Sequence, residues 1–209
     1  HDGPVWKAES GVGYAQERLH FRSGDKGYFN QVVSTRRDVT VRFDEIFYLR
    51  PGRITVTDGT TGAPVDPYEL DNYVMSTTNA TFRRTSDVKR SAYAHLRRAF
   101  DLGGRPFALK GGVDVRQSLR DDRQTTPSFT VVGADGRPST TPAGSDDRAS
   151  AAFDPVFSQR VAPYGFPKID YVSTQNAYNI YKDHPTWFTL DENALYRSVV
   201  TNSKYAEEM

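Results

Sequence analysis

The 209-residue sequence contains no cysteine, which excludes disulfide bonds, zinc–thiolate sites and a cysteine nucleophile. It also lacks any run of about 18 apolar residues, so no transmembrane helix is predicted. Its 27 Lys and Arg nearly balance its 26 Asp and Glu, which leaves no global field to attract nucleic acid. The sequence opens at His1 without a signal-peptide pattern, and we expect it to be an internal piece of a longer protein.

Aromatic residues are plentiful where aliphatic residues are scarce. The broad apolar set makes up only 37% of the chain, yet there are 12 Tyr, 12 Phe and 2 Trp. A disordered tail would be poor in aromatic residues. The composition is therefore typical neither of disorder nor of an ordinary compact core.

The clearest pattern is an alternation of period two from Val88 to Leu102, and helical stripes are hard to find. Even positions there are mostly apolar, and odd positions are mostly polar or aromatic, with His95 on the polar side. Gly103-Gly104-Arg105-Pro106 suits a tight turn, and the alternation resumes from Phe107. Two alternating runs around such a turn predict an antiparallel hairpin.

The remaining alternation predicts one all-β domain over residues 1–209, made of antiparallel up-and-down strands. We predict strands near 5–22, 38–49, 53–58, 87–102 and 106–119, and a long loop over 120–203. If each strand crosses one layer, both tight turns lie on one side and the long loops on the other. Outer-membrane barrels have short periplasmic turns and longer external loops. The pattern therefore favours a segment of a transmembrane β-barrel with long extracellular loops.

The residues of the predicted hairpin also resemble a known family. Arg105–Arg116, preceded by Arg97-Arg98-Ala99-Phe100, resembles a barrel hairpin of TonB-dependent outer-membrane receptors, especially large bacterial receptors with long inserted loops. Arg160–Pro167 and Ser203–Glu208 are similar to the large loop and the beginning of the next strand in such proteins. The resemblance spans most of the chain as a style of hairpin and loop, without a short signature. The family's plug domain, TonB box and aromatic C-terminal residue are absent, so an internal barrel fragment is implied.

The resemblance implies an active transporter in the bacterial outer membrane that imports a scarce nutrient of the siderophore, cobalamin or glycan class. The implied partners are outer-membrane lipid, a small-molecule or glycan ligand, and a TonB-type energising protein that acts through the missing plug region. Neither a cofactor, an enzymatic activity nor nucleic acid is expected. The alternative is a secreted or surface β-sandwich that binds carbohydrate, in which the apolar face lies in a dry core.

The candidate ligand-binding residues lie in an aromatic and amide-rich run within the long loop. We predict that Tyr178, Tyr181, Asp183 and Trp187 contact ligand, since flat rings offer stacking area and polar groups supply directional hydrogen bonds. The competing interpretation is that these rings form the loop's own core. The full run also includes other residues of the same chemistry, namely Tyr171, Gln175, Asn176 and Asn179.

No catalytic or metal-binding residue is predicted. The four His residues form no HExxH pattern. The pairs Asp121-Asp122 and Asp146-Asp147 are adjacent carboxylates, which point in opposite directions on an extended chain. Neither pair therefore makes the acid–nucleophile couple of a glycosidase, and a hydrolase lacks support.

Overall fold

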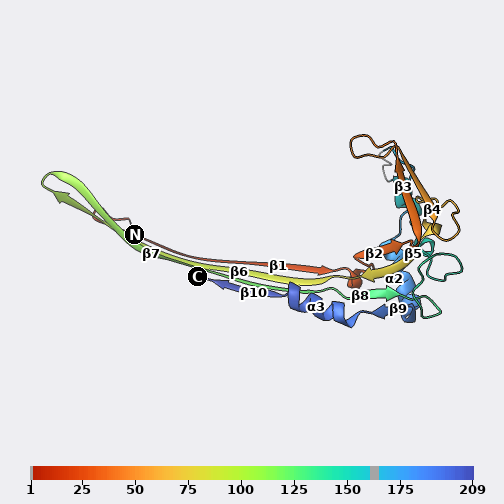
Figure 1. Cartoon of the computed structure of the whole chain (residues 1–209). Coiled ribbons are helices and arrows are strands. Elements are labelled where there is room, and N and C mark those ends of the chain that lie inside the picture. Colours follow the sequence, from red (N-terminus) through yellow and green to blue (C-terminus); the bar gives the residue numbers. More distant parts are fainter. Residues whose placement is uncertain (1, 161–164) are drawn as a thin grey trace. The chain divides into compact units, whose positions relative to one another are not determined.

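The computed structural model describes residues 2–160 and 165–209, and the chain divides into two compact units where one domain was predicted. Unit 1 combines His1–Phe21, Arg83–Gln124 and Val199–Met209, and unit 2 combines Arg22–Phe82 and Thr125–Ser198. The structure is mostly antiparallel β-sheet with a smaller share of helix, which confirms the predicted β-rich class (Figure 1). Residues 161–164 of the predicted loop motif lie outside the described residues.

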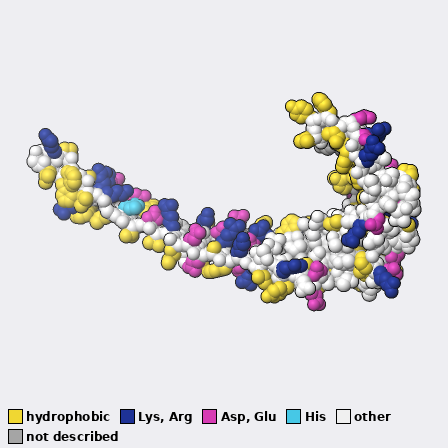
Figure 2. Space-filling model, viewed as in Figure 1, with side chains coloured by type: hydrophobic (Ala, Val, Ile, Leu, Met, Phe, Trp, Pro, Cys, Tyr) yellow, Lys and Arg dark blue, Asp and Glu magenta, His cyan; other side chains and the backbone are white. Residues whose placement is uncertain are grey.

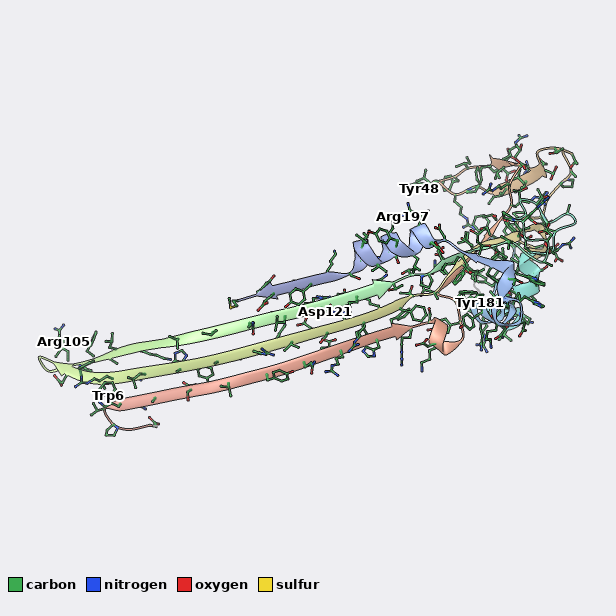
Figure 3. All side chains as sticks on the ribbon, turned by 90° about the horizontal axis from the view of Figure 1, so that it is seen from below. Trp6, Tyr48, Arg105, Asp121, Tyr181 and Arg197 are labelled. Carbon is green, nitrogen blue, oxygen red and sulfur yellow. The ribbon has the colours of Figure 1, made fainter. Side chains whose placement is uncertain are left out.

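Unit 1 is built on a four-stranded sheet in the order β1-β6-β7-β10. The strands are β1 (Trp6–Arg22), β6 (Phe82–Leu102), β7 (Arg105–Thr125) and β10 (Lys204–Glu208). Only Gly103 and Gly104 separate β6 from β7, and their φ angles of 62° and 75° suit the two-residue hairpin turn that matches strand twist. The hairpin prediction is confirmed, although the strands run to 21 residues each. Figure 3 labels Arg105 beside this turn.

Contacts across the sheet fix which residues oppose each other. Gly11 lies against the ring of Tyr93, where an added Cβ would come within 2.6 Å of the ring, and Gly13 lies against Ser91. As residue numbers rise from Gly11 to Gly13 on β1, those of the opposing residues on β6 fall from Tyr93 to Ser91, so the two strands are antiparallel. On the other side of the sheet, β10 pairs antiparallel with β7. Gly11 of β1 therefore leaves room for the Tyr93 ring of the neighbouring strand.

The strands β3 (Val39–Asp44) and β4 (Arg53–Asp58) form a separate two-stranded sheet in unit 2. The prediction that they continue one up-and-down layer after β1 is therefore wrong, because the neighbour of β1 is β6. An alternating pattern sets the faces of a strand but does not name its partner. The strand predicted over 38–49 also ends early, because Glu45 takes a left-handed φ of 56°.

Unit 2 contains a second four-stranded antiparallel sheet, in the order β2-β5-β8-β9. Its strands are β2 (Gln31–Thr35), β5 (Val74–Asn79), β8 (Ser128–Val131) and β9 (Phe188–Leu190). A buried apolar cluster forms the core of this unit; its members are Phe29, Leu70, Met75, Ala80, Val131, Ala149, Ala152, Ala177 and Phe188.

The prediction of a long loop over 120–203 is wrong, because this segment contains regular secondary structure. It holds β8, β9 and the helices α1 (Pro155–Arg160), α2 (Thr174–Asp183) and α3 (Glu192–Asn202). Short 3-10 turns complete the chain at η1 (Gly24–Lys26), η2 (Leu70–Asn72), η3 (Ala149–Ala152) and η4 (Pro185–Trp187). In the part of the chain that the structure describes, no helix combines the length and apolar character needed to cross a lipid bilayer.

Helix α2 forms because its sequence carries both a cap and an apolar face. The Ser173 hydroxyl oxygen accepts a hydrogen bond from the Asn176 backbone N–H at 3.1 Å, which satisfies one of the unpaired donors of the first turn. Ala177 is fully buried, and Tyr181, one turn later, packs on the same core. Tyr178 and Tyr181 of the aromatic and amide run therefore lie on the buried face of a helix.

Candidate functional site

The structure places the four predicted ligand residues in different surroundings. The rings of Tyr178 and Tyr181 lie 5.3 and 5.7 Å from the ring of Phe29, which is 1% exposed. Trp187 also packs on this core, and its ring stacks on His184 at 4.0 Å. Asp183 is exposed at the end of α2. Packing against the core of unit 2 is enough to explain the positions of the three rings. Contact of these rings with a ligand stays a prediction.

Two other residues of the aromatic and amide run, Tyr171 and Gln175, line an open pocket of about 460 Å³ in unit 2. Tyr28, Asp154 and Phe157 line the same pocket. The rings of Phe157 and Tyr171 meet edge to face, with centroids 4.9 Å apart. Their side chains remain 49% and 40% exposed, so both rings offer free area to a ligand. We call this cavity the aromatic pocket.

Hydrogen bonds hold the two rings of the aromatic pocket in place. Asp154 immediately precedes α1, and its Oδ1 accepts a hydrogen bond from the Phe157 backbone N–H at 2.8 Å. The Ser158 hydroxyl donates to the Asp154 carbonyl at 2.6 Å and accepts from the Tyr171 backbone N–H at 2.8 Å. The helix that carries Phe157 is thus tied directly to the segment that carries Tyr171. This preorganisation lowers the entropy that a ligand must remove on binding.

The chemistry of the aromatic pocket suits binding of a small polar molecule. Perpendicular rings accept the flat face of a sugar or chelate, while the carboxylate of Asp154 and the amide of Gln175 supply directional hydrogen bonds. Among residues 2–160 and 165–209, no group of three or more His, Asp or Glu is placed to hold a metal ion.

The long sheet of unit 1 exposes large apolar side chains on one face. The Arg98 guanidinium lies over the rings of Trp6 and Phe100, at 4.9 and 4.8 Å, and the ring of Phe107 lies 6.2 Å from that of Phe100. These contacts place four residues from three strands on the same side. Alternation then assigns further residues to it, and we call them together the apolar face: Trp6, Val12, Tyr14, Leu96, Phe100, Phe107, Leu109, Val113 and Val115.

The opposite side of the same sheet is polar along the length of the apolar face, and exposed apolar side chains such as Leu19 lie beyond it on this side. The Tyr93 hydroxyl donates to Glu9 Oε1 at 3.2 Å, and Arg116 pairs with Asp114 at 2.9 Å. We call this side the polar face; Lys7, Glu9, Tyr93, His95, Arg97, Lys110, Asp114 and Arg116 belong to it. Figure 2 shows hydrophobic and charged side chains along this sheet, with hydrophobic ones gathered near the β6–β7 turn at the left of the view. The sheet therefore has two faces of opposite character.

The tip of the β3–β4 hairpin is a separate exposed apolar surface. Phe47 and Arg50 pair through two backbone hydrogen bonds, at 2.9 and 3.0 Å, around Tyr48 and Leu49. These two residues have φ angles of 49° and 64° and are 92% and 97% exposed. Left-handed φ angles are costly for large side chains and often accompany function. Figure 3 labels Tyr48 on this hairpin.

Sequence reasoning missed Tyr28 and the pairing of Phe157 with Tyr171. The local signal for Phe157 was Asp154-Pro155, an N-cap residue followed by proline at the first helical position. That signal places Phe157 in the first turn of a helix. No local signal could bring Tyr28 to the same pocket, because more than a hundred residues separate it from the rest.

Comparison with known proteins gives no relative for this chain: no protein-family model, no curated protein and no solved structure matches it.

Proposed function

We propose that this chain is part of an outer-membrane β-barrel transporter of the TonB-dependent receptor type, which imports a scarce small molecule or glycan. The single observation that carries the proposal is the apolar face of unit 1. Large side chains such as Val12 and Val113 are 90% and 65% exposed there, on a sheet whose other side is charged. Burying that face in lipid hydrocarbon removes the cost of exposing it to water.

The dimensions of the apolar face support this proposal. The eight steps from Phe107 to Val115 span about 27 Å along the strand at about 3.4 Å per residue, which is about 19–22 Å along the membrane normal at a barrel tilt of about 35–45°. Outer-membrane barrels present an apolar band about 25 Å tall, with aromatic girdles at both interfaces. Trp6 and Phe107 lie at the turn end of the face, and Tyr14 lies at its other end. Arg98 lies over the aromatic rings at the turn end, where its head group can reach the lipid head groups.

The strand lengths favour a barrel over the alternative of a secreted carbohydrate-binding β-sandwich. Strands in globular proteins usually have about 3–10 residues. β6 and β7 have 21 residues each. Strands of this length can cross a bilayer and continue beyond it. In a barrel, the two edge strands, β1 and β10, would pair with further strands of the whole protein.

In this proposal the polar face lines the lumen and the aromatic pocket of unit 2 contributes to ligand capture. The partners would be outer-membrane lipid, the imported ligand and a TonB-type energising protein that acts through a plug domain. Stacking on Phe157 and Tyr171 would hold the ligand, and Gln175 would orient it. In this proposal the chain forms part of the barrel wall and helps to bind the ligand, and it catalyses no chemical step.

Phe157→Ala and Tyr171→Ala are each expected to weaken ligand binding by about 1 kcal/mol, roughly fivefold in Kd, because each removes one stacking ring. Binding is measured with the whole protein in detergent against a panel of oligosaccharides, ferric siderophores and cobalamin. Uptake of the best ligand is then measured in cells that express the same variants.

Tyr196→Ala is the matched control, because Tyr196 is a 71% exposed ring of α3 that does not line the aromatic pocket. It should bind as the wild type does. If both pocket variants bind and import the ligand as well as this control does, the aromatic pocket has no part in recognition.

A further inference from the structure

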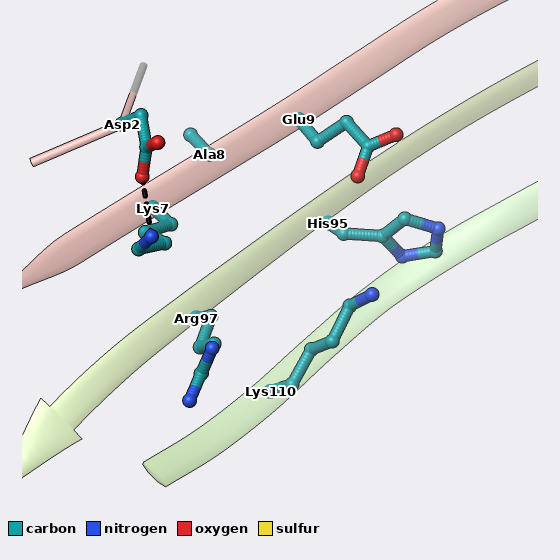
Figure 4. Close-up of a pocket in the computed structure, with 7 residues that line it drawn as sticks. All are labelled: Asp2, Lys7, Ala8, Glu9, His95, Arg97 and Lys110. Carbon is teal, nitrogen blue, oxygen red and sulfur yellow. Dashed lines mark ion pairs between the residues drawn. The ribbon is translucent and has the colours of Figure 1, made fainter.

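The polar face of unit 1 contains an open depression of about 570 Å³ that the proposed function does not use. Side chains from β1, β6 and β7, together with Asp2, line it (Figure 4). The titratable residues are Asp2, Lys7, Glu9, His95, Arg97 and Lys110. Figure 2 shows basic side chains gathered along this part of the sheet.

Both acidic residues of the depression already have partners. Asp2 Oδ1 lies 2.6 Å from Lys7 Nζ, and Glu9 Oε1 accepts a hydrogen bond from the Tyr93 hydroxyl at 3.2 Å. Within the described residues, no carboxylate lies within ion-pair distance of Arg97 or Lys110. The Tyr93 hydroxyl is neutral, so Glu9 keeps its negative charge, and Lys7, Arg97 and Lys110 against Asp2 and Glu9 leave the depression a formal net charge of +1. Arg97 and Lys110 are the two cations of the depression without an ion-pair partner among the described residues.

These two cations oppose each other on neighbouring strands. Phe100 lies opposite Phe107, and His95 lies opposite Gly112. The same antiparallel register places Arg97 of β6 opposite Lys110 of β7. Like charges directly opposite on a sheet are destabilising. Both cations border an open cavity without an ion-pair partner, so an anion in that cavity would lower their electrostatic energy.

We propose that this depression binds the oxyanion group, carboxylate or phosphate, of a small-molecule ligand. The planar guanidinium of Arg97 can donate two parallel hydrogen bonds to such a group, and Lys110 adds a compact positive charge. His95 borders the same space and offers a further ring nitrogen. The site belongs to unit 1 alone, so it is independent of the aromatic pocket and of whether the sheet lies in a membrane.

The test is isothermal titration of the whole protein, in a nonionic detergent, with citrate and with pyrophosphate at low ionic strength. The double variant Arg97→Gln/Lys110→Gln should bind at least about tenfold more weakly, because it loses both cations that lack an ion-pair partner among the described residues. Arg98→Gln is the matched control, since Arg98 lies on the apolar face over Trp6. Its affinity should stay within about twofold of the wild type.

Thermal unfolding supplies a second readout that does not depend on affinity. Without ligand, the double variant should be at least as stable as the wild type, because the like-charge couple is gone. Citrate should raise the Tm of the wild type and of Arg98→Gln but not of the double variant. The proposal is overturned if neither anion binds the wild type, if the double variant binds equally well, or if the double variant unfolds at a lower temperature without ligand. Binding of a hexaglutamate peptide without binding of either small anion would also overturn it, since it would assign the depression to an acidic polypeptide.

Discussion

Replacing Leu96 with Lys is expected to destabilise the protein in a lipid bilayer by about 2–4 kcal/mol, the cost of a cation at the membrane midplane on the lipid side of a barrel. Leu96 is 49% exposed and lies in the middle of the apolar face, between the levels of Phe100 and Val12. The measurement is guanidinium-induced unfolding of the whole protein in phosphatidylcholine vesicles.

Tyr93→Lys is the control for this substitution, because Tyr93 lies on the polar face of the same strand, next to the carboxylate of Glu9. It places the same charge on the side that faces the watery lumen, so its cost should be well below that of Leu96→Lys. Equal costs for the two variants would contradict the assignment of the faces to lipid and water.

Asp122→Asn is expected to lower the free energy of unfolding by about 1–3 kcal/mol, as loss of charge-assisted hydrogen bonds does. Asp122 is 8% exposed and lies beyond the apolar face on β7. It accepts hydrogen bonds from Arg83 Nε at 2.9 Å, from Arg83 Nη2 at 2.5 Å and from Thr85 Oγ1 at 2.8 Å. Asp121→Asn is the control: Asp121 pairs with Arg123 at 3.0 Å on the surface, which contributes about 1 kcal/mol or less.

The effect of Asp122→Asn should depend on pH in a defined direction. Hydrogen bonds from Arg83 lower the pKa of Asp122 to about 2, from an ordinary value of 3.8. A depressed folded-state pKa adds stability that is fully present above the unfolded pKa, near 4, and is lost as the pH falls through about 2. The stability difference between the wild type and the variant should therefore shrink between about pH 4 and pH 2, as urea unfolding at several pH values would show. A difference that stays constant over this range would contradict the pairing of Asp122.

The β6–β7 hairpin could be predicted because its information is local. The alternation from Val88 to Leu102, the two glycines and the renewed alternation from Phe107 all lie within a short stretch of chain. The partners of β1 and β3 could not be predicted in this way. Both strands alternate, and alternation assigns residues to faces without choosing a neighbouring strand.

The candidate site was predicted in part for a related reason. The chemistry of the aromatic and amide run predicts a binding surface, but the same residues also carry the helical spacing of α2. Tyr178 and Tyr181 therefore lie against Phe29 in the core, while Tyr171, just before the helix, is free to line the aromatic pocket. Asp121 pairs with Arg123, two residues along the same strand, whereas Asp122 pairs with Arg83 of β6, which agrees with the expectation that the two carboxylates point to opposite sides.

The most direct test of the central claim is a cysteine scan from Ala92 to Phe100 in the whole protein, reconstituted in vesicles. These 209 residues contain no cysteine, and any cysteine elsewhere in the whole protein is first replaced by serine, so that each single substitution reports one position. A fluorophore at even positions, such as Ala94 and Leu96, should be quenched by a lipid-phase quencher. Odd positions, such as Tyr93 and Arg97, should instead react with a water-soluble thiol reagent. If no position in the scan senses lipid, the apolar face is not a membrane surface and the transporter proposal fails.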